Sequence, residues 1–225
     1  MKILIKYPTR KRPDKFIPAF DLYYKMLSGK HDFQFMVSMD NDDVSMKNDK
    51  ILKFLDLPHV SYNYSNNKTK VQAVNADMSN LYFDILLLAS DDMLPLAKDY
   101  DDIIIQNMLR FFPLLDGCLH FNDGFKPQLN TLSIMGVNLY KHFGYIYHPD
   151  YISLWCDNEY QEVTERANKA VYINETIIKH EWTNYTGIDE LHKHNEQFYL
   201  KDKQTFEKRK ALNFPKESVH VLTKW

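Results

Sequence analysis

The stretch Asp84-Ile85-Leu86-Leu87-Leu88-Ala89-Ser90-Asp91-Asp92 decides the fold, because five consecutive apolar residues are followed, after one serine, by two adjacent carboxylates. A continuous apolar run of this length predicts a strand buried on both faces, as in a parallel sheet. Adjacent acids at a strand end repel each other unless a cation or hydrogen-bond donors compensate them. Mg²⁺ and Mn²⁺ prefer a few carboxylates together with phosphate and water. The pair therefore fits a metal site, and it equally fits a capped turn ahead of Met93-Leu94-Pro95.

Strands and helices are expected to alternate upstream of this stretch. Each β-rich run is followed by a segment in which apolar residues recur with helical spacing. The expected strands cover residues 3–7, 33–39 and 60–64, and the expected helices cover residues 14–27, 47–55 and 69–81. This alternation predicts an α/β fold with a doubly wound, largely parallel sheet.

Polar residues cluster after each of the four expected strands, at 9–12, 40–43, 66–68 and 90–92. Open parallel sheets bind ligands beyond the carboxyl ends of their strands. One polar loop would carry little weight, since loops are polar in general, but four in register indicate a binding site at this edge of the sheet.

The second half of the chain has a less regular pattern. Helices are expected at 97–112, 140–143 and 158–168, the last with a capping box formed by Asn158 and Gln161. Strands are expected at 120–124, 132–135, 171–174 and 177–180, and residues 188–212 form a charged, amphipathic helical tail. No repeat or linker interrupts the chain, so residues 1–225 are expected to form a single domain.

Composition excludes several classes of protein. The chain has 225 residues, 44% of them hydrophobic and 26% charged, with a formal net charge of −2. That charge disfavours non-specific coating of nucleic acid. Cys118 and Cys156 follow no metal-ligand spacing and are expected to be buried free thiols. No run approaches the roughly 18 apolar residues of a membrane span, and no signal peptide is seen, so we expect a cytoplasmic protein. The oligomeric state is not predicted.

The order of these motifs resembles that of the GT-A glycosyltransferases, in particular family-2-like members, whose DxD-type motif follows the fourth strand. The segment Thr9-Arg10-Lys11-Arg12-Pro13 is similar to the opening of several such enzymes. The resemblance covers residues 2–182 and implies a Rossmann-like, mixed but mostly parallel sheet flanked by helices, with a C-terminal helical tail. Ala89 departs from the usual pattern, since it replaces the first acid.

The resemblance implies a nucleotide-diphosphate sugar as donor and Mn²⁺ or Mg²⁺ as cofactor. It makes Asp92 the favoured metal ligand, with Asp91 and His180 as further ligands, although Asp91 alternatively contacts ribose. The positions that it assigns to the donor are Thr9, Arg10, Arg12, Asp40, Lys70, Asn75, Ser90, Asp91 and Gly136. Among these, Arg10, Arg12 and Lys70 are also candidates for stabilising the charge of the diphosphate.

The resemblance places the catalytic base in Trp155-Cys156-Asp157-Asn158-Glu159. A sugar hydroxyl is a poor nucleophile until a base accepts its proton, and Asp157 is the first choice for that base, with Glu159 second. Acids in a first helical turn also serve simply to cap the helix. The expected reaction is transfer to an acceptor hydroxyl with inversion, and retention stays open because the donor half looks alike in both classes.

Several interpretations stay open. Residues 1–96 are expected to bind the nucleotide sugar, 97–187 the acceptor, and 188–225 to form the tail. An inactive nucleotide-sugar-binding module is one alternative. A sugar-phosphate nucleotidyltransferase is another, disfavoured because the loop 9–13 lacks glycine. The acceptor is a saccharide or another hydroxyl compound; the near-neutral charge disfavours DNA, although the Lys-rich stretch 201–216 leaves it open.

For several further side chains, a functional and a purely structural interpretation are both possible. Asp123 either forms a turn or contacts sugar hydroxyls. The aromatic residues Tyr145, Tyr147, Tyr151 and Trp155 either line an acceptor groove or pack in the core. His192 and His194 are expected to be solvated on the tail.

Overall fold

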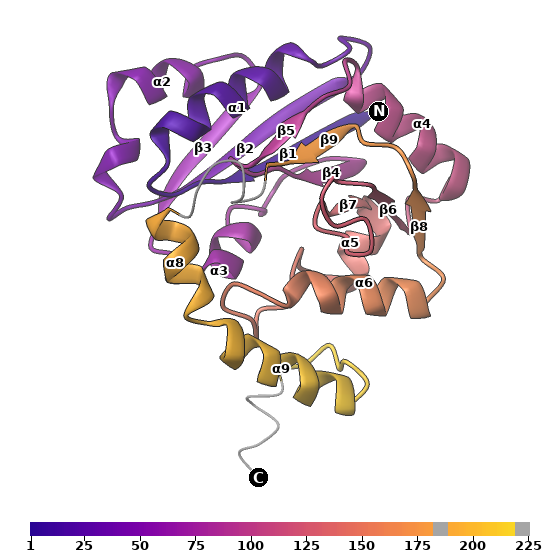
Figure 1. Ribbon diagram of the computed structural model, residues 1–225. Coiled ribbons are helices and arrows are strands. Elements are labelled where there is room, and N and C mark those ends of the chain that lie inside the picture. The colour runs from indigo at the N-terminus through magenta and orange to yellow at the C-terminus, as the bar shows by residue number, and fades with distance from the viewer. Residues whose placement is uncertain (182–188, 219–225) are drawn as a thin grey trace.

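The computed structural model describes residues 1–181 and 189–218, and its centre is a seven-stranded sheet (Figure 1). In spatial order the strands are β3 (Val60–Ser65), β2 (Asp32–Asp40), β1 (Lys2–Pro8), β4 (Ile85–Leu88), β7 (Ile134–Gly136), β6 (Cys118–Phe121) and β8 (Ala170–Ile173). The first four of these are mutually parallel, β7 runs antiparallel to both of its neighbours, and β8 is parallel to β6. The expected mixed, mostly parallel sheet is therefore confirmed.

Helices cover both faces of the sheet. The helices α1 (Pro13–Lys25), α2 (Asp49–Leu55) and α4 (Tyr100–Phe111) lie on one face, and α3 (Lys70–Asn75), α5 (Val137–Phe143) and α6 (Cys156–Arg166) lie on the other (Figure 1). A short 3₁₀ helix, η1 (Val44–Met46), precedes α2. Helices on two faces of a mostly parallel sheet define the α/β class that the alternating pattern predicts.

The strand β4 joins the two halves of the core. Ile85 and Leu87 pack in the cluster beneath α1 and α4, whereas Leu86 and Leu88 pack in the cluster beneath α3 and α5. All four side chains are buried, so the strand has no solvent-facing side. This double burial explains why the run is apolar at every position rather than at alternate ones.

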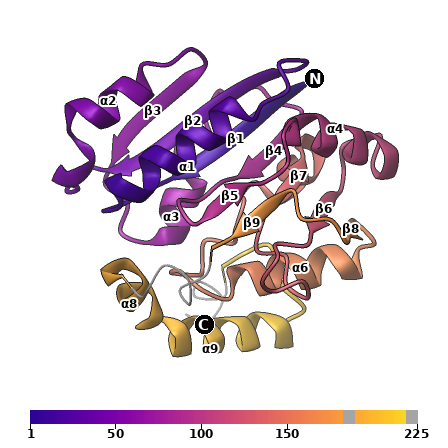
Figure 2. The same ribbon diagram turned by 45° about the horizontal axis from the view of Figure 1, so that its top comes forward.

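A second, two-stranded sheet lies beside the first (Figure 2). It pairs β5 (Met93–Pro95) with β9 (Ile178–His180) in antiparallel register, with Met93 opposite His180. The β5 strand was not predicted, because three residues ending in proline give little local signal. Its pairing brings the chain around residue 180 next to the carboxylates at 91 and 92, and the backbone N–H of Glu181 donates to the carbonyl of Asp92 at 2.7 Å.

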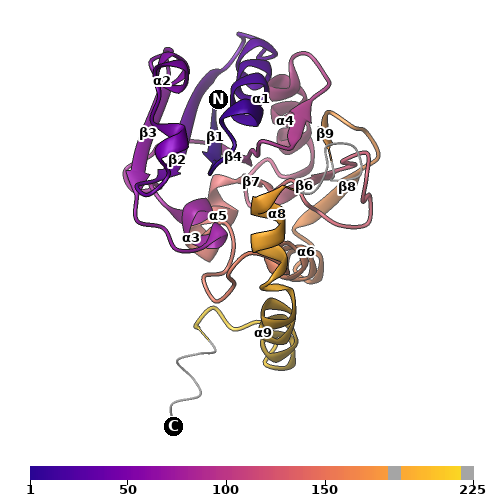
Figure 3. The same cartoon turned by 60° about the vertical axis from the view of Figure 1, so that its left-hand side comes forward.

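The C-terminal tail forms two helices, α8 (Glu190–Glu196) and α9 (Tyr199–Ala211), which follow one another along one side of the molecule (Figure 3). The prediction of one continuous helical segment at 188–212 is thus wrong at its middle, where the chain turns between the two helices. Residues 182–188, which contain the expected boundary between acceptor half and tail, lie outside the described residues.

The predicted capping box of α6 is also wrong. The helix begins at Cys156, and its N-cap Trp155 makes no side-chain capping bond. The Gln161 side chain instead accepts from the backbone N–H of Asn130 at 2.8 Å and donates to the carbonyl of Gln128 at 3.1 Å, which fastens the loop before β7 to the helix. Within the described ranges, no helix combines the length and apolarity needed to cross a bilayer.

Candidate functional site

The polar loops that follow β1, β2 and β4 meet at one edge of the sheet, as parallel strands require. The segments concerned are 9–12, 40–43 and 90–92, and the first turn of α8 joins them from the C-terminal tail. This convergence assembles residues from the two ends of the chain into one acidic and basic cluster.

Asp91 faces inward from this cluster. The hydroxyl of Thr9 donates to its Oδ2 at 2.9 Å, and the Tyr7 hydroxyl lies against the same carboxylate. Burial raises the pKa of Asp91 to about 7, an effect that the bond from Thr9 reduces and the charge of Asp92 increases. Asp91 therefore ties β1 to β4 and leaves the outer position to its neighbour.

Asp92 faces the loops and the tail. The Ser90 hydroxyl donates to its Oδ1, and its Oδ2 lies 3.4 Å from Arg12 Nη1 and 3.7 Å from His192 Nε2. Burial alone would raise the pKa of Asp92, but the bonds from His192 and Ser90, with the nearby charges of His180 and Arg12, hold it well below its usual range. Asp92 is thus a firmly ionised carboxylate among groups that favour its negative charge.

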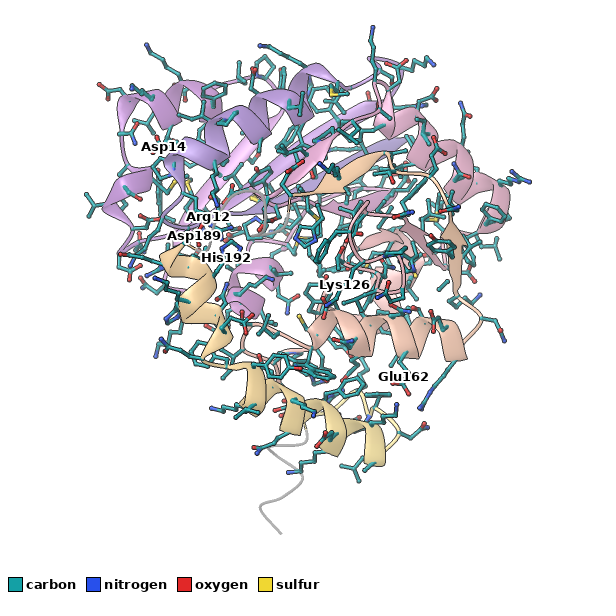
Figure 4. All side chains as sticks on the ribbon, viewed as in Figure 1. Arg12, Asp14, Lys126, Glu162, Asp189 and His192 are labelled. Carbon is teal, nitrogen blue, oxygen red and sulfur yellow. The ribbon has the colours of Figure 1, made fainter. Side chains whose placement is uncertain are left out.

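The first turn of α8 completes this cluster. Asp189 caps the helix by accepting from the His192 N–H at 2.9 Å, and it also pairs with Arg12 Nε at 2.9 Å and Lys15 Nζ at 2.9 Å. Figure 4 shows Arg12, Asp189 and His192 gathered at the same place. The expectation that His192 is solvated is wrong, since its side chain is only 14% exposed. His194, in contrast, is exposed as expected.

His180 is the last residue of β9 and pairs with Met93, the residue after Asp92. Its Nδ1 is 3.4 Å from Asp123 Oδ2, and its charge helps to lower the pKa of Asp92. Asp123 itself is buried and accepts from the backbone N–H groups of Phe125 and Lys126 at 2.9 and 2.6 Å. Asp123 therefore shapes the turn after β6, in agreement with the first of its two readings.

Asp40 links the loops that follow β1, β2 and β3. Arg10 Nη1 lies 2.5 Å from its Oδ2, and Asn67 donates to its Oδ1 at 3.0 Å. Arg10 also forms two bonds to the exposed Asp42, at 2.7 and 2.8 Å. These contacts make one polar surface next to Asp91 and Thr9.

Lys6 was not singled out from the sequence, yet it is fully buried in the middle of β1. Its Nζ donates to Ser38 Oγ and to the carbonyl of Ala76, and burial lowers its pKa to about 8, although the charge of Asp77 opposes this. Asp77 accepts from Ser38 at 2.5 Å and from Asn63 at 2.7 Å. The signal was a lysine inside an otherwise apolar strand, which requires a buried partner.

Asp157 and Glu159 occupy different surroundings. Burial raises the pKa of the partly buried Asp157, while the charges of Lys70 and Lys126 counteract the rise. Glu159 is buried and receives two bonds from Arg209, at 2.7 and 2.9 Å, and one from the Tyr151 hydroxyl at 2.7 Å. Both oxygens of Glu159 are therefore engaged in hydrogen bonds within the protein.

Two residues that were predicted to contact the sugar donor, Asn75 and Gly136, are instead engaged in contacts within the protein. The Asn75 side chain donates to the carbonyl of Tyr147 at 2.6 Å and accepts from the N–H groups of Ile146 and Tyr147. Gly136 pairs with Ile85, the first residue of β4, and so lies at the opposite end of that strand from Asp91. A Cβ there would approach the Leu115 carbonyl oxygen to 2.3 Å, which explains the glycine by backbone packing and not by donor approach.

The four aromatic residues with two readings pack within the protein. Tyr147 and Tyr151 are buried beside α6, and the Tyr147 hydroxyl accepts from Ser133 at 3.0 Å. The Tyr145 ring contacts His148, and Trp155 packs against α9. These contacts support core packing for the group.

A divalent cation at this site would need several oxygen or imidazole ligands. In residues 1–181 and 189–218, no group of three or more His, Cys, Asp or Glu side chains is arranged to hold a metal. Asp92 nevertheless offers an ionised carboxylate with His180 and His192 in its electrostatic surroundings. A cation held by this one carboxylate would take most of its ligands from a bound diphosphate and water.

Comparisons with known proteins define the fold. No family model matches the chain, and no curated protein matches it in sequence. Among solved structures, a mannosyltransferase from Pyrobaculum calidifontis in complex with GDP-mannose and Mn²⁺ superposes with a TM-score of 0.60 at 12% identity, over 80% of this chain and 56% of that one. S. aureus TarS superposes with a TM-score of 0.59 at 15% identity, over 83% and 62%.

A mutant of Drosophila β1,4-galactosyltransferase 7, in complex with manganese, UDP-galactose and xylobiose, gives a TM-score of 0.52 at 14% identity, over 82% of this chain and 72% of that one. The chain therefore has the GT-A fold of nucleotide-diphospho-sugar transferases, as the motif order implied. It spans 56% and 62% of the length of the mannosyltransferase and TarS structures, so it corresponds to a part of those proteins.

Proposed function

We propose that this chain is a glycosyltransferase that moves a sugar from a nucleotide-diphosphate donor to an acceptor hydroxyl, with a divalent cation and with inversion. The observation that carries the proposal is geometric: at the carboxyl edge of a GT-A sheet, the Asp92 carboxylate lies 3.4 Å from the Arg12 guanidinium, beside the bonded pair of Thr9 and Asp91. The surroundings of two acids agree with it, because the pKa of Asp92 is lowered and that of Asp157 is raised. Acids whose surroundings drive their pKa values apart are suited to two different tasks, permanent charge and proton exchange.

Asp92 would anchor Mn²⁺ or Mg²⁺, with His180 and His192 as the imidazoles at hand. When bound, the cation supplies positive charge to the departing diphosphate. Arg12 would bind the diphosphate, because its guanidinium already lies beside Asp92 and presents several donors to phosphate oxygens. Thr9, Ser90 and Asp91, with Arg10 and Asp40 on the adjoining loops, would hold the nucleoside.

Asp157 would act on the acceptor side. The acceptor oxygen forms a bond to the anomeric carbon while the bond from that carbon to the diphosphate oxygen breaks, and Asp157 takes the proton of the acceptor hydroxyl. A single displacement from the face opposite the diphosphate inverts the anomeric centre. The raised pKa of Asp157 brings its proton affinity closer to that of a useful base near neutral pH.

A nucleotidyltransferase is the second candidate. A cytidylyltransferase from Leptospira borgpetersenii superposes with a TM-score of 0.50 at 16% identity, over 77% of this chain and 75% of that one. The loop 9–13 opposes this function, since it has no glycine to let backbone N–H groups approach a triphosphate.

The decisive assay incubates the chain with a panel of nucleotide-diphosphate sugars and Mn²⁺, with and without a panel of saccharide acceptors. Release of nucleoside diphosphate from one donor, abolished in Asp157→Asn while that variant still binds the nucleoside diphosphate, is the expected result. Release of pyrophosphate from CTP or another nucleoside triphosphate with a sugar phosphate would identify the second candidate instead. Binding without turnover of any donor, in wild type and variant alike, would identify an inactive module.

A further inference from the structure

The turn 152–155, which leads into α6, is held by a single buried carboxylate on α9. Asp202 is fully buried, and it accepts from the backbone N–H of Ile152 at 2.9 Å and from those of Ser153 and Leu154 at 2.8 Å each. A buried carboxylate is stable only where hydrogen bonds replace its water, and here the turn supplies three of them. The turn and α9 are therefore bound to each other, although Ile152 and Asp202 lie 50 positions apart in the sequence.

The last residue of this turn has a strained backbone. Trp155 adopts φ +63°, in the left-handed region that a bulky side chain rarely enters. Its ring packs against two aromatic rings of α9, with centroid distances of 5.2 Å to Phe206 and 5.6 Å to Tyr199. Such a conformation persists only where the surroundings enforce it. Helix α9 supplies these surroundings in two ways: Asp202 binds the backbone N–H groups of the turn, and Phe206 and Tyr199 pack against the Trp155 ring.

This strained turn determines where Asp157 points. Trp155 is the N-cap of α6 and has no side-chain capping bond, so the turn contributes directly to the direction in which the helix starts. Asp157 is the second residue of that helix, and its Oδ1 accepts from the Asn158 N–H at 3.0 Å. A shift of the turn would move this carboxylate with it.

A second side chain of α9 binds the helix α6 two residues after Asp157. Arg209 is fully buried and pairs with Glu159 through Nε and Nη2, and its Nη1 lies 3.0 Å from Asp150. The contacts from α9 thus bracket Asp157: Asp202 holds residues 152–154 before it, and Arg209 holds Glu159 after it. The other tail helix, α8, contacts Arg12 and Asp92 instead, so of the two described tail helices it is α9 that acts on this side of the site.

We propose that Asp202 is a positioning residue for the reaction, acting through the turn 152–155 to orient the candidate base Asp157. The inference rests on the proposed function, because it presumes that Asp157 accepts the acceptor proton. General bases contribute only when their carboxylate stands within hydrogen-bond reach of the proton that they take. The C-terminal helix α9 is then part of the catalytic apparatus, while the donor site is built without it.

The test compares wild type with Asp202→Asn, which keeps the size of the side chain but presents an N–H₂ group to N–H donors. We expect kcat to fall about 100-fold, as misplacement by about 1 Å can cause. The dissociation constant of the nucleoside diphosphate, measured by calorimetry, should stay within twofold. The acidic limb of the pH profile of kcat should also move, because the surroundings of Asp157 change.

Trp155→Gly tests the same role without removing a carboxylate. Glycine adopts φ +63° without strain, but the packing of the Trp155 ring against Phe206 and Tyr199 is lost. It too should lose kcat and keep donor affinity. Glu207→Gln, an exposed change on α9, is the matched control and should leave both quantities as in wild type.

These measurements distinguish a failure of the positioning role of Asp202 from a failure of the proposed function. If wild type transfers sugar and both folded variants keep its kcat and pH profile, or lose donor affinity in parallel with kcat, the positioning role of Asp202 is refuted and the proposed function stands. If wild type transfers no sugar from any donor, or Asp157→Asn keeps full activity, the proposed function fails and the positioning role falls with it.

Discussion

Arg12 and Asp189 lie 177 positions apart in the sequence, yet their side chains form a close ion pair, with Nε 2.9 Å from Oδ2 and Nη2 3.0 Å from Oδ1. The same guanidinium lies 3.4 Å from Asp92, so it stands between the carboxylate that ends β4 and the one that begins α8. The candidate donor site thus depends on both ends of the described chain. A phosphate group entering it meets a guanidinium that two carboxylates already orient.

Arg12→Ala should weaken nucleoside diphosphate binding about 10- to 100-fold, or about 1.4 to 2.7 kcal/mol, the scale of charged hydrogen bonds to phosphate. The affinity for the corresponding nucleoside should stay unchanged, because the bonds of Thr9 and Asp40, which are proposed to hold the nucleoside, are made to other residues. Calorimetric titration with both ligands measures the difference. Arg110→Ala on the exposed end of α4 is the control, and an equal loss for nucleoside and diphosphate would contradict the assigned role.

Transfer should rise with pH through the pKa of Asp157, since a base acts in its deprotonated form. Burial raises that pKa above the ordinary 3.8, and the charge of Lys126 partly offsets the rise. Lys126→Ala should therefore move the acidic limb of the kcat/KM profile to higher pH, because it removes a positive charge that favours the ionised carboxylate. A limb that stays in place, as it should in the control Lys50→Ala on α2, would argue against Asp157 as the titrating group.

Asp157→Asn should make the protein more stable at pH 8. A carboxylate with a raised folded pKa favours folding below its unfolded pKa of about 3.8, and that contribution is lost as pH rises through the folded value. The ionised wild-type side chain is thus destabilising at pH 8, and asparagine removes the charge while it keeps the oxygen that accepts from Asn158. Urea unfolding should show the gain at pH 8 and a smaller one at pH 4. Asp56→Asn, on the exposed end of α2, should show neither; a gain for Asp157→Asn that is independent of pH would contradict the electrostatic cause.

Gly136→Ala should destabilise the fold by about 3 kcal/mol, the upper range for an overpacked site. The added Cβ would lie 2.3 Å from the Leu115 carbonyl oxygen, and neither backbone can yield easily. Gly29→Ala is the matched comparison, because nothing lies within 4 Å of its Cβ and its φ of +71° costs about 1 kcal/mol for alanine. Urea midpoints should rank the two in that order, and equal losses would show that the close approach to Leu115 is relieved by movement.

The sequence predicted those parts of the fold that have a local cause. The apolar run 85–89 identifies a strand buried on both faces by itself, and the polar loops after β1, β2 and β4 meet because parallel strands end at one edge. Strands were expected at 132–135 and 177–180, where β7 and β9 lie, but their antiparallel pairing and the strand β5 were not predicted, since the partners of three-residue strands are not specified by their own pattern.

The candidate site was predictable to a similar extent. Asp92 and Asp157 follow from motif order, but the place of His192 depends on the return of α8 to Arg12, which no local pattern contains. The start of α6 was misplaced for a related reason, because contacts with α9 enforce the turn at Trp155 where a capping motif at Asn158 was expected. Gly136 was assigned to the donor because a glycine needed for backbone packing looks the same in sequence as one needed for ligand approach.

We propose that Asp92 and a divalent cation hold a nucleoside diphosphate at the edge of this sheet. The most direct measurement is a thermal-shift screen of nucleoside diphosphates, with and without Mn²⁺, on wild type and Asp92→Asn. One diphosphate at about 100 times its Kd should stabilise the wild type by about 2.7 kcal/mol, a shift of roughly 5–10 °C, with Mn²⁺ present. The shift should be much smaller without Mn²⁺ and lost in Asp92→Asn. Equal shifts with and without Mn²⁺, or no shift with any diphosphate, would contradict the claim.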